Sequence, residues 1–191
     1  MGGRRLRRLD TVASADYVAA MRIAILAAVL IVASGGAAMA FELVSPAFRS
    51  GETIPHQHTC DGADVSPRLS WKDPPAGAQA FALVCDDPDA PAGTWMHWVL
   101  WNAPGTARGL DEGVKAEPSL PDGARQGRND FKRIGWNGPC PPPGKPHRYF
   151  FRLHALDRPL DLAPGATKAE LVKAMQGHTL GSAELVGMYG R

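Results

Sequence analysis

Turn-forming residues divide most of this chain into short segments, and this division limits the folds available to it. All 17 prolines and 17 of the 21 glycines follow residue 40. Proline lacks a backbone N–H and glycine is conformationally free, so both residues interrupt helices and strands and favour turns. The spacing of these residues excludes long helices and predicts several short strands that are joined by loops.

Apolar and aromatic runs of strand length lie between the turns. The predicted strands cover residues 79–86, 94–102, 147–157 and 180–189, with two shorter candidates at 41–43 and 69–71. In the third of these runs the odd positions are apolar or aromatic over most of its length. Because side chains alternate along a strand, His147 and Tyr149 are predicted to point the same way.

One segment has the pattern of a helix. Thr167 and Glu170 have the spacing of a capping box, Leu171 and Met175 belong to an apolar stripe, and Gly177 is a stop signal. Many strands with one or two helices predict a mainly β fold, a β-sandwich with appended helices.

The start of the chain has the features of an export signal. Arg22 precedes an unbroken apolar run over residues 23–33, and an Ala-Met-Ala triplet ends at residue 40. A charged flank, a short apolar run and an A-x-A site are typical of a secretory signal peptide. The run is shorter than the roughly 20 apolar residues that cross a bilayer.

These features predict three parts of the chain. We expect residues 1–20 to be a non-native or disordered extension, residues 21–40 to be a signal peptide, and residues 41–191 to be a single mature domain without a transmembrane segment. A twin-arginine signal and a basic tail before a membrane anchor are the alternatives. The expected location of the mature protein is the periplasm or the extracellular medium.

Charge argues against a nucleic-acid partner. The chain has 21 basic and 19 acidic residues, but its first 40 residues hold five of the basic and two of the acidic ones. The remaining part, with 16 basic and 17 acidic residues, is close to neutral. It lacks the basic excess that binds DNA or RNA.

Three cysteines lie after the predicted signal. Cys85 is inside an apolar strand-like run, which favours a buried free thiol. Cys60 and Cys140 are in loops rich in glycine, proline and aspartate, and an oxidising compartment permits disulfides. We predict a Cys60–Cys140 disulfide, although the sequence leaves other pairings open. The sequence has no C-x-x-C or H-x3-H pair, so no metal site is expected.

Four clusters have side chains suited to chemistry. They are the acidic turn at 86–91, the aromatic run with a histidine at 95–98, the Gly/Pro-rich loop at 135–144, and the His-Arg-Tyr triplet at 147–149. Alone, each has an ordinary structural interpretation, such as a solvated turn or a packed histidine. Together they form a set in which neutral Tyr and His side chains donate hydrogen bonds to an anion.

Strand alternation makes one further prediction about the second cluster. It places Trp95, His97, Val99 and Trp101 on one face. No Gly-x-Ser-x-Gly elbow, P-loop or dinucleotide fingerprint is present, so the sequence favours neither a serine hydrolase nor a nucleotide enzyme, and no cofactor is expected.

The motifs resemble those of a known family. Residues 61–67 (DGADVSP), 87–91 (DPDAP), 95–98 (WMHW), 138–142 (GPCPP) and 147–149 (HRY) occur in the order and rough spacing of the phosphatidylethanolamine-binding protein family. More narrowly, the chain is similar to the bacterial Raf-kinase-inhibitor-like branch. The resemblance covers essentially the whole predicted mature chain.

The resemblance implies a fold of two antiparallel sheets in a β-sandwich with short flanking helices. It also implies a pocket for a small anion such as phosphate, acetate or a phospholipid headgroup, and a cis bond before Pro91. The residues that it implies for the pocket are Asp87, His97, Cys140 through its backbone, His147 and Tyr149, with Asp89 supporting the loop.

The expected function is therefore an exported binding protein for a small anionic or phosphorylated ligand, not an enzyme, with inhibition or modulation of a partner protein as a further role. Two alternatives remain at this point. One is a hydrolase that uses His97 or His147 with Asp87. The other is an interaction module that binds proteins through a long loop at 107–131 and keeps only a vestigial pocket.

Overall fold

A computed structural model describes residues 40–191 of the chain. The predicted extension over residues 1–20, and all but the last residue of the predicted signal peptide over residues 21–40, lie outside the described residues. In the part that is described, no helix is both long enough and apolar enough to cross a membrane.

The larger of two sheets contains the four long strands of the fold. Its strands, in spatial order, are β6 (Arg125–Gln126), β4 (Trp95–Pro104), β3 (Ala80–Asp87), β7 (His147–Leu156) and β8 (Thr179–Tyr189). All neighbouring strands are antiparallel. The long strands coincide closely with the four predicted from apolar runs, and β3, which is buried along its whole length, lies at the centre.

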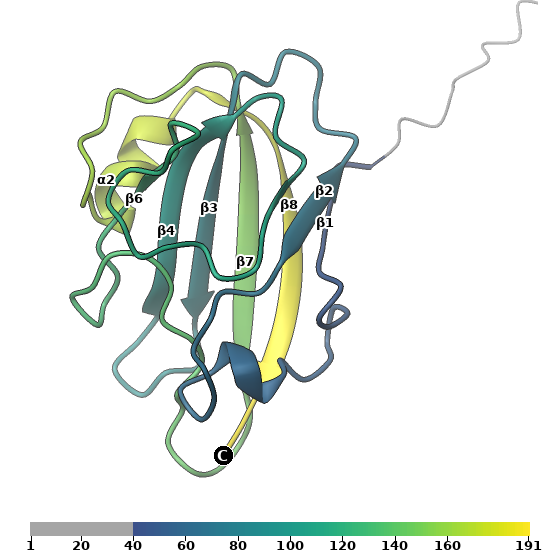
Figure 1. The fold of residues 1–191 in the computed structure, drawn as a ribbon, viewed down its shortest axis with the longest axis vertical. Helices are drawn as coiled ribbons and strands as arrows, with labels where there is room; N and C mark the ends of the chain where they lie inside the picture. The colour runs from purple at the N-terminus through teal and green to yellow at the C-terminus, as the bar shows by residue number, and fades with distance from the viewer. Residues whose placement is uncertain (1–39) are drawn as a thin grey trace, which may run out of the picture. The chain divides into compact units, whose positions relative to one another are not determined.

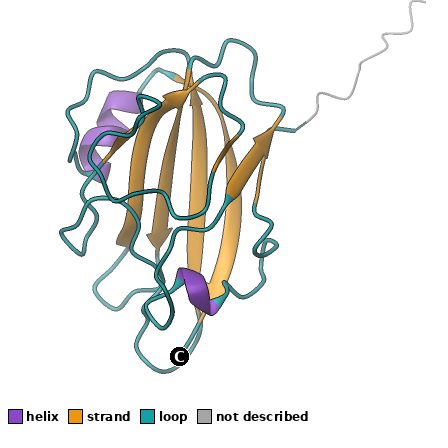
Figure 2. Ribbon diagram, viewed as in Figure 1, coloured by secondary structure: helices purple, strands orange, loops and turns teal. Residues whose placement is uncertain are grey.

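The smaller sheet packs over one face of the larger one (Figure 1). It consists of β1 (Glu42–Val44), β2 (Leu69–Lys72) and β5 (Gly109–Leu110), again antiparallel. The short helix η1 (His56–His58) lies between β1 and β2 in the sequence, and α2 (Lys168–Met175) precedes β8 (Figure 2). The predicted two-sheet antiparallel β-sandwich with short flanking helices is confirmed.

The helix begins where the sequence predicts it to begin. The side chain of Thr167 accepts a hydrogen bond from the backbone of Glu170, and the Glu170 carboxylate accepts one from the Thr167 backbone N–H. This reciprocal pair satisfies two backbone donors that a helix start otherwise leaves free. Leu171 and Met175 then point into the protein interior.

The stretch at 107–131 differs from the single long loop expected of it. It contributes β5 to the small sheet and β6 to the edge of the large sheet. Each strand has two residues, which is too short to leave a periodic signal in the sequence. Gln126 is fully buried, and its amide donates to the carbonyl oxygens of Lys115 and Glu117. Part of this stretch is therefore held inside the fold.

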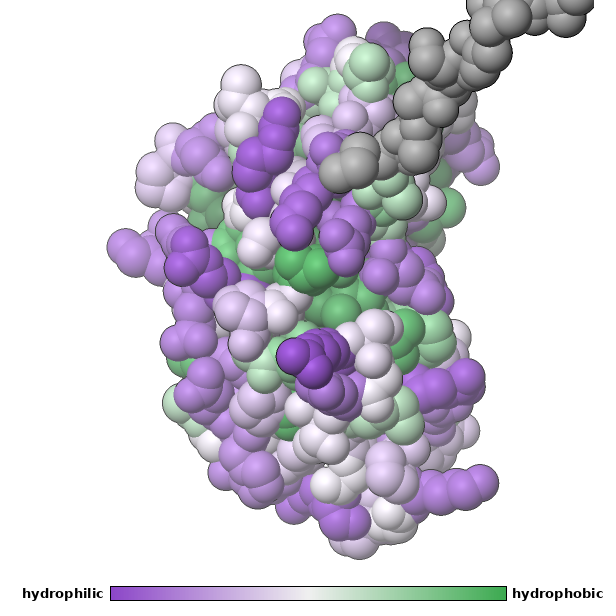
Figure 3. Space-filling view, turned by 90° about the vertical axis from the view of Figure 1, so that its right-hand side faces the viewer, coloured by the Kyte–Doolittle hydropathy of each residue, from purple (hydrophilic) through white to green (hydrophobic). Residues whose placement is uncertain are grey.

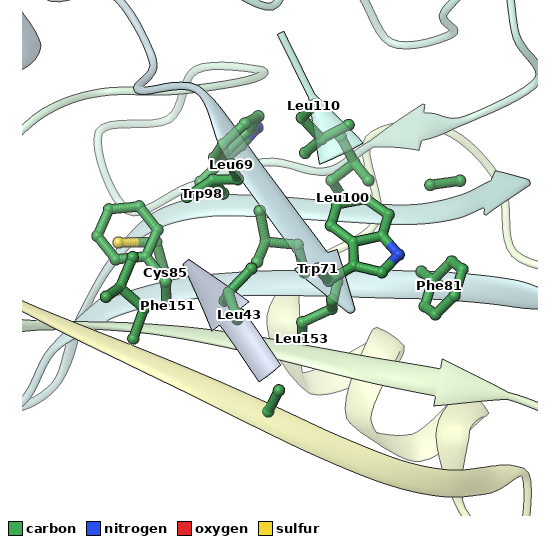
Figure 4. Packing of buried hydrophobic residues seen from close by; sticks show 14 of the residues in the cluster. Leu43, Leu69, Trp71, Phe81, Cys85, Trp98, Leu100, Leu110, Phe151 and Leu153 are labelled. Carbon is green, nitrogen blue, oxygen red and sulfur yellow. The ribbon is translucent and has the colours of Figure 1, made fainter. Parts of the chain in front are cut away.

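The main core lies between the two sheets. Figure 4 shows Leu43, Trp71 and Leu110 of the small sheet beside Phe81 and Leu153 of the large one, and all five are buried in one cluster. A second cluster lies on the opposite face of the large sheet, where α2 covers it. Strand β3 is apolar on both faces because each of its faces packs against one of these clusters.

A β-bulge at His97 interrupts the pairing of β3 with β4. Met96 lies opposite Asp86, whereas Trp98 lies opposite Cys85, so His97 is an additional residue in its strand. A bulge of this kind shifts the side-chain alternation by one position and redirects the side chains that follow it.

Because of this bulge, the prediction that Trp95, His97, Val99 and Trp101 share one face of the strand is wrong. Trp95 and His97 line a cavity at one end of the sheet. Val99 and Trp101 lie on the other face, in the cluster that contains Leu171 of α2. Strict alternation cannot detect the bulge, because the signal for it is a change of register against a distant strand.

The surface on the side of β1, β2 and β8 is mostly hydrophilic, with hydrophobic residues gathered in a band near its middle (Figure 3). Over residues 40–191, Val172 and Leu180 are the large apolar side chains that are exposed, at 44% and 43%. Single exposed apolar residues are ordinary on soluble proteins.

Candidate functional site

A cavity of about 270 Å³ opens where β3 ends and where β4 and β7 begin. Four polar or titratable side chains in its lining are buried, at 8% exposure or less: Asp87, His97, His147 and Tyr149. Mostly apolar residues complete the lining: Ala90, Pro91, Ala92, Trp95, Phe131, Cys140, Pro141 and Pro142. A small ligand would therefore meet an apolar rim around a polar floor.

An aspartate–histidine pair forms one part of the floor. Asp87 Oδ2 lies 2.7 Å from His147 Nδ1. The two residues are 60 positions apart in the sequence and meet because β3 and β7 are antiparallel neighbours. Asp87 Oδ1 accepts the backbone N–H of Asp89 at 2.8 Å, so the carboxylate is held at both oxygens.

Asp89 lies beside the pocket and outside its lining. Its carboxylate accepts two hydrogen bonds from the Arg148 guanidinium, at 2.8 and 2.6 Å, and one from the Arg148 backbone N–H. The hydrogen bonds from Arg148 lower the pKa of Asp89 to about 2. This pair connects the turn after β3 to β7.

The low pKa of Asp89 predicts a pH-dependent contribution to stability. Because the ordinary value is 3.8 and the folded one about 2, the contribution is complete above about pH 4 and is lost as pH falls through 2. Wild type is expected to unfold at higher urea than Asp89→Asn at neutral pH, and the difference is expected to disappear near pH 2. Asp111→Asn, which removes a largely exposed partner of Arg68, serves as control. A difference that persisted at pH 2 would contradict the assignment.

His97 forms a second part of the floor. Its Nδ1 donates to the Asn137 carbonyl oxygen at 2.6 Å, and the Asn137 side chain accepts from Asn129 Nδ2 at 2.8 Å. Its ring packs edge-on against Phe131 and Tyr149. Burial lowers the pKa of His97 below its ordinary value, so the ring is neutral at physiological pH.

Tyr149 is part of the cavity lining, and its buried hydroxyl is unpaired within residues 40–191. The side chain is 0% exposed, and its oxygen has no hydrogen-bond partner among the described residues. Burial raises the pKa of Tyr149, so the phenol keeps its proton. Because a buried hydroxyl without a partner is unfavourable, this atom is suited to donate to a bound ligand.

The predicted disulfide is present. Cys60 and Cys140 are bonded, and Cys85 is a buried free thiol. The Cys60 backbone N–H also donates to the Pro139 carbonyl at 3.1 Å, and the Gly138 N–H donates to Asp64. The loop that supplies one wall of the cavity is thereby attached to the turn after η1.

The expectation of a cis bond before Pro91 is wrong. No peptide bond in residues 40–191 is cis. The turn closes with a trans bond, through a hydrogen bond from the Gly93 N–H to the Ala90 carbonyl at 3.0 Å. The two hydrogen bonds of the Asp87 carboxylate already hold the start of this turn.

The structure brings five of the six predicted pocket residues to one cavity and leaves Asp89 next to it. Sequence reasoning included Phe131 and Asn137 within the loops at 107–131 and 135–144 but assigned neither to the pocket, and both shape the cavity around His97. Both lie in irregular loops, where no periodic pattern identifies a residue that faces a site. Within residues 40–191, no three His, Cys, Asp or Glu side chains are grouped as metal ligands.

The fold and the cavity together define a class of protein: a two-sheet antiparallel β-sandwich in which the strand ends of the larger sheet enclose a small pocket with a polar floor. The sequence model of the phosphatidylethanolamine-binding protein family matches residues 44–190. The chain therefore belongs to this family, as its motifs predict.

Several relatives support this assignment. A UPF0098 protein from Methanothermobacter thermautotrophicus is 52% identical over 149 residues, which cover 78% of this chain and 98% of the relative. The UPF0098 protein YbhB from Escherichia coli is 40% identical over 156 residues, covering 78% of this chain and 99% of YbhB.

Solved structures have the same fold. A phosphatidylethanolamine-binding protein homolog from Chlamydia trachomatis superposes with a TM-score of 0.73 at 39% identity, covering 80% of this chain and 98% of that chain. Escherichia coli YbcL, described as a member of the mammalian PEBP family, gives a TM-score of 0.74 at 34% identity, covering 79% and 98%.

Proposed function

We propose that the protein binds a small oxyanion, such as a phosphate ester or a carboxylate, in the cavity. The observation that carries the proposal is the Tyr149 hydroxyl, which is buried at the floor without a partner among the described residues. An oxygen atom of a ligand placed beside this hydroxyl would accept its hydrogen. The imidazole rings of His97 and His147 line the same space.

The cavity also restricts what is attached to the anion. Its volume of about 270 Å³ is near the lower end for small-molecule sites, which suits a headgroup rather than a large metabolite. Trp95 and Phe131 pack edge-on at the rim and offer an apolar surface to a substituent. The family is described by binding to phosphatidylethanolamine, a phosphate diester, which supports a phosphate ester as the ligand.

We propose binding rather than turnover. The lining contains no serine or threonine, and its cysteine, Cys140, is bonded to Cys60. A covalent mechanism through an activated hydroxyl of serine or threonine, or through a free thiol, therefore has no candidate nucleophile in this lining. One observation favours the alternative of a hydrolase: the Asp87–His147 pair has the geometry of a general base that could activate water. Turnover of phosphate or carboxylate esters that disappears in His147→Ala would establish that alternative.

We also propose that the mature protein acts outside the cytoplasm. Two features support this: the apolar run and Ala-Met-Ala triplet near the start of the chain, and the disulfide between Cys60 and Cys140, which oxidising compartments favour. Fractionation of cells that produce the full chain tests the location. Inhibition of a partner protein stays a prediction.

Tyr149→Phe is expected to weaken binding of inorganic phosphate about 10- to 100-fold, because a hydrogen bond to a charged group contributes about 1.5–3 kcal/mol. Tyr189→Phe is the matched control, since this hydroxyl donates to Asp61 Oδ2 at 2.6 Å and lies outside the cavity. Isothermal titration calorimetry measures both affinities. Equal phosphate affinities in the two variants would contradict the proposed site.

A further inference from the structure

The two pocket histidines use the same ring nitrogen to bond to the protein. His97 Nδ1 lies 2.6 Å from the Asn137 carbonyl oxygen, and His147 Nδ1 lies 2.7 Å from Asp87 Oδ2. A carbonyl and an ionised carboxylate only accept hydrogen bonds, so each Nδ1 carries the hydrogen. A neutral imidazole has a single N–H. Each neutral ring therefore has an unprotonated Nε2 as its remaining polar atom.

This geometry corrects the expectation that neutral histidines in the pocket donate to an anion. While both rings are neutral, the side-chain donors of the lining are the Tyr149 hydroxyl and the Trp95 indole N–H. Asp87 adds a negative charge behind His147. A fully ionised ligand would therefore meet two nitrogen lone pairs and a carboxylate, against two neutral donors. The pocket needs one more proton to hold an oxyanion well.

The additional proton is best placed on His147. An imidazolium there would keep its bond to Asp87 through Nδ1 and would offer Nε2–H to the ligand, as in other carboxylate-oriented histidines. His97 faces a carbonyl group instead of a carboxylate, and burial lowers its pKa. The two histidines therefore have different roles, although they line the same cavity.

The other charged groups around His147 leave Asp87 as its main electrostatic partner. Asp89 is neutralised by the bidentate bond from Arg148. Tyr149 keeps its proton, and Tyr189, opposite His147 in the sheet, donates its hydroxyl to Asp61. The groups that face or flank the His147 ring are Asp87 and Asp89 from β3 and the turn after it, His97 from β4, Arg148 and Tyr149 from β7, and Tyr189 from β8.

We propose that anion binding in this cavity is coupled to protonation of His147, so that the Asp87–His147 pair takes up one proton for each anion bound. This inference rests on the proposed binding of an oxyanion. The overall step is balanced: an anion and a proton from solvent enter together, and no covalent bond forms or breaks other than the new Nε2–H. The protein then releases its ligand as pH rises.

Sulfate is the sharpest probe, because it does not titrate in the range of histidine and cannot bring its own proton. Isothermal titration of the purified full chain with sulfate, in two cationic buffers of different ionisation enthalpy, measures both the affinity and the protons taken up. Sulfate affinity is expected to fall by up to about tenfold per pH unit as the pH rises, because the protein must take up a proton from an increasingly dilute supply when the anion binds. Over the pH range in which the affinity falls, proton uptake is expected to approach about one proton per bound sulfate.

Three variants assign the proton. His147→Gln supplies a permanent amide donor, so its sulfate affinity is expected to be independent of pH. His97→Gln is expected to bind more weakly but to keep the pH slope. His154→Gln, on the outer side of the same strand, is the matched control and is expected to behave as wild type. Because the two-buffer measurement uses wild-type protein, it decides the coupling even where a variant does not fold.

The outcomes separate this inference from the proposed function. Failure of sulfate, inorganic phosphate and acetate to bind at any pH would overturn oxyanion binding and the inference with it. Sulfate binding with no proton uptake would leave the proposed function standing and overturn the coupling. Phosphate binding without sulfate binding would place the proton on the ligand instead of His147. A slope lost in His97→Gln and kept in His147→Gln would overturn the assignment to His147.

Discussion

Joint replacement of Cys60 and Cys140 by alanine is expected to lower the free energy of unfolding by about 4.5 kcal/mol. The bond closes a loop with a sequence separation of 80 residues, and its loss returns the corresponding chain entropy to the unfolded state. Urea unfolding at neutral pH measures the change. The variant is also expected to bind anions more weakly, because Cys140 is part of the cavity wall.

Reduction of the wild-type protein provides the control. Wild type in a thiol reductant is expected to match the double variant, since the third cysteine, Cys85, is buried and unbonded. The double variant itself is expected to show no response to reductant. An unfolding free energy of wild type that did not change after complete reduction of the bond would contradict the predicted contribution.

Trp98→Ala is expected to cost about 4 kcal/mol of stability, in the range for removal of a fully buried aromatic side chain. Trp98 is 0% exposed and packs edge-on against Trp136 in the core between the sheets. Its indole Nε1 donates to Gln126 Oε1 at 2.8 Å. The variant creates a cavity in the core and leaves the buried amide oxygen of Gln126 without this donor. Thermal or urea unfolding measures the loss of stability.

Trp95→Ala is the matched control in the same strand. Trp95 is half-buried at the rim of the ligand cavity, where it packs against Phe131. Its replacement is expected to cost about 1 kcal/mol of stability and to act mainly on ligand affinity. A stability cost for Trp95→Ala equal to that of Trp98→Ala would contradict the assigned environments of the two side chains.

The elements that sequence reasoning identified correctly have local signals. The apolar run at 79–86 and the alternation from His147 onward predict β3 and β7 within a residue or so. The capping box of Thr167 and Glu170 predicts the start of α2. Each of these signals lies within about ten residues and depends on backbone chemistry that the neighbouring residues decide.

The residue types of the candidate site could be predicted from the sequence, whereas its geometry could be predicted only in part. Family motifs pointed to Asp87, His97 and Tyr149, and all three line the cavity. Phe131 and Asn137 were not predicted, because contacts between loops have no periodicity. Whether a pocket histidine donates to a ligand could not be predicted from residue types either, since the role of each ring nitrogen depends on which atom lies opposite it.

Residue patterns thus specified strands, a helix and a mainly β fold, because hydrophobic period, capping and turn chemistry act over short distances along the chain. Tertiary structure alone decided the bulge at His97, the strands β5 and β6, and the contact between Asp87 and His147 across 60 residues. Those features depend on strand register and on the partner that each polar atom meets in space. A one-residue shift in register changes which side chains face the cavity, and local sequence holds little information about such a shift.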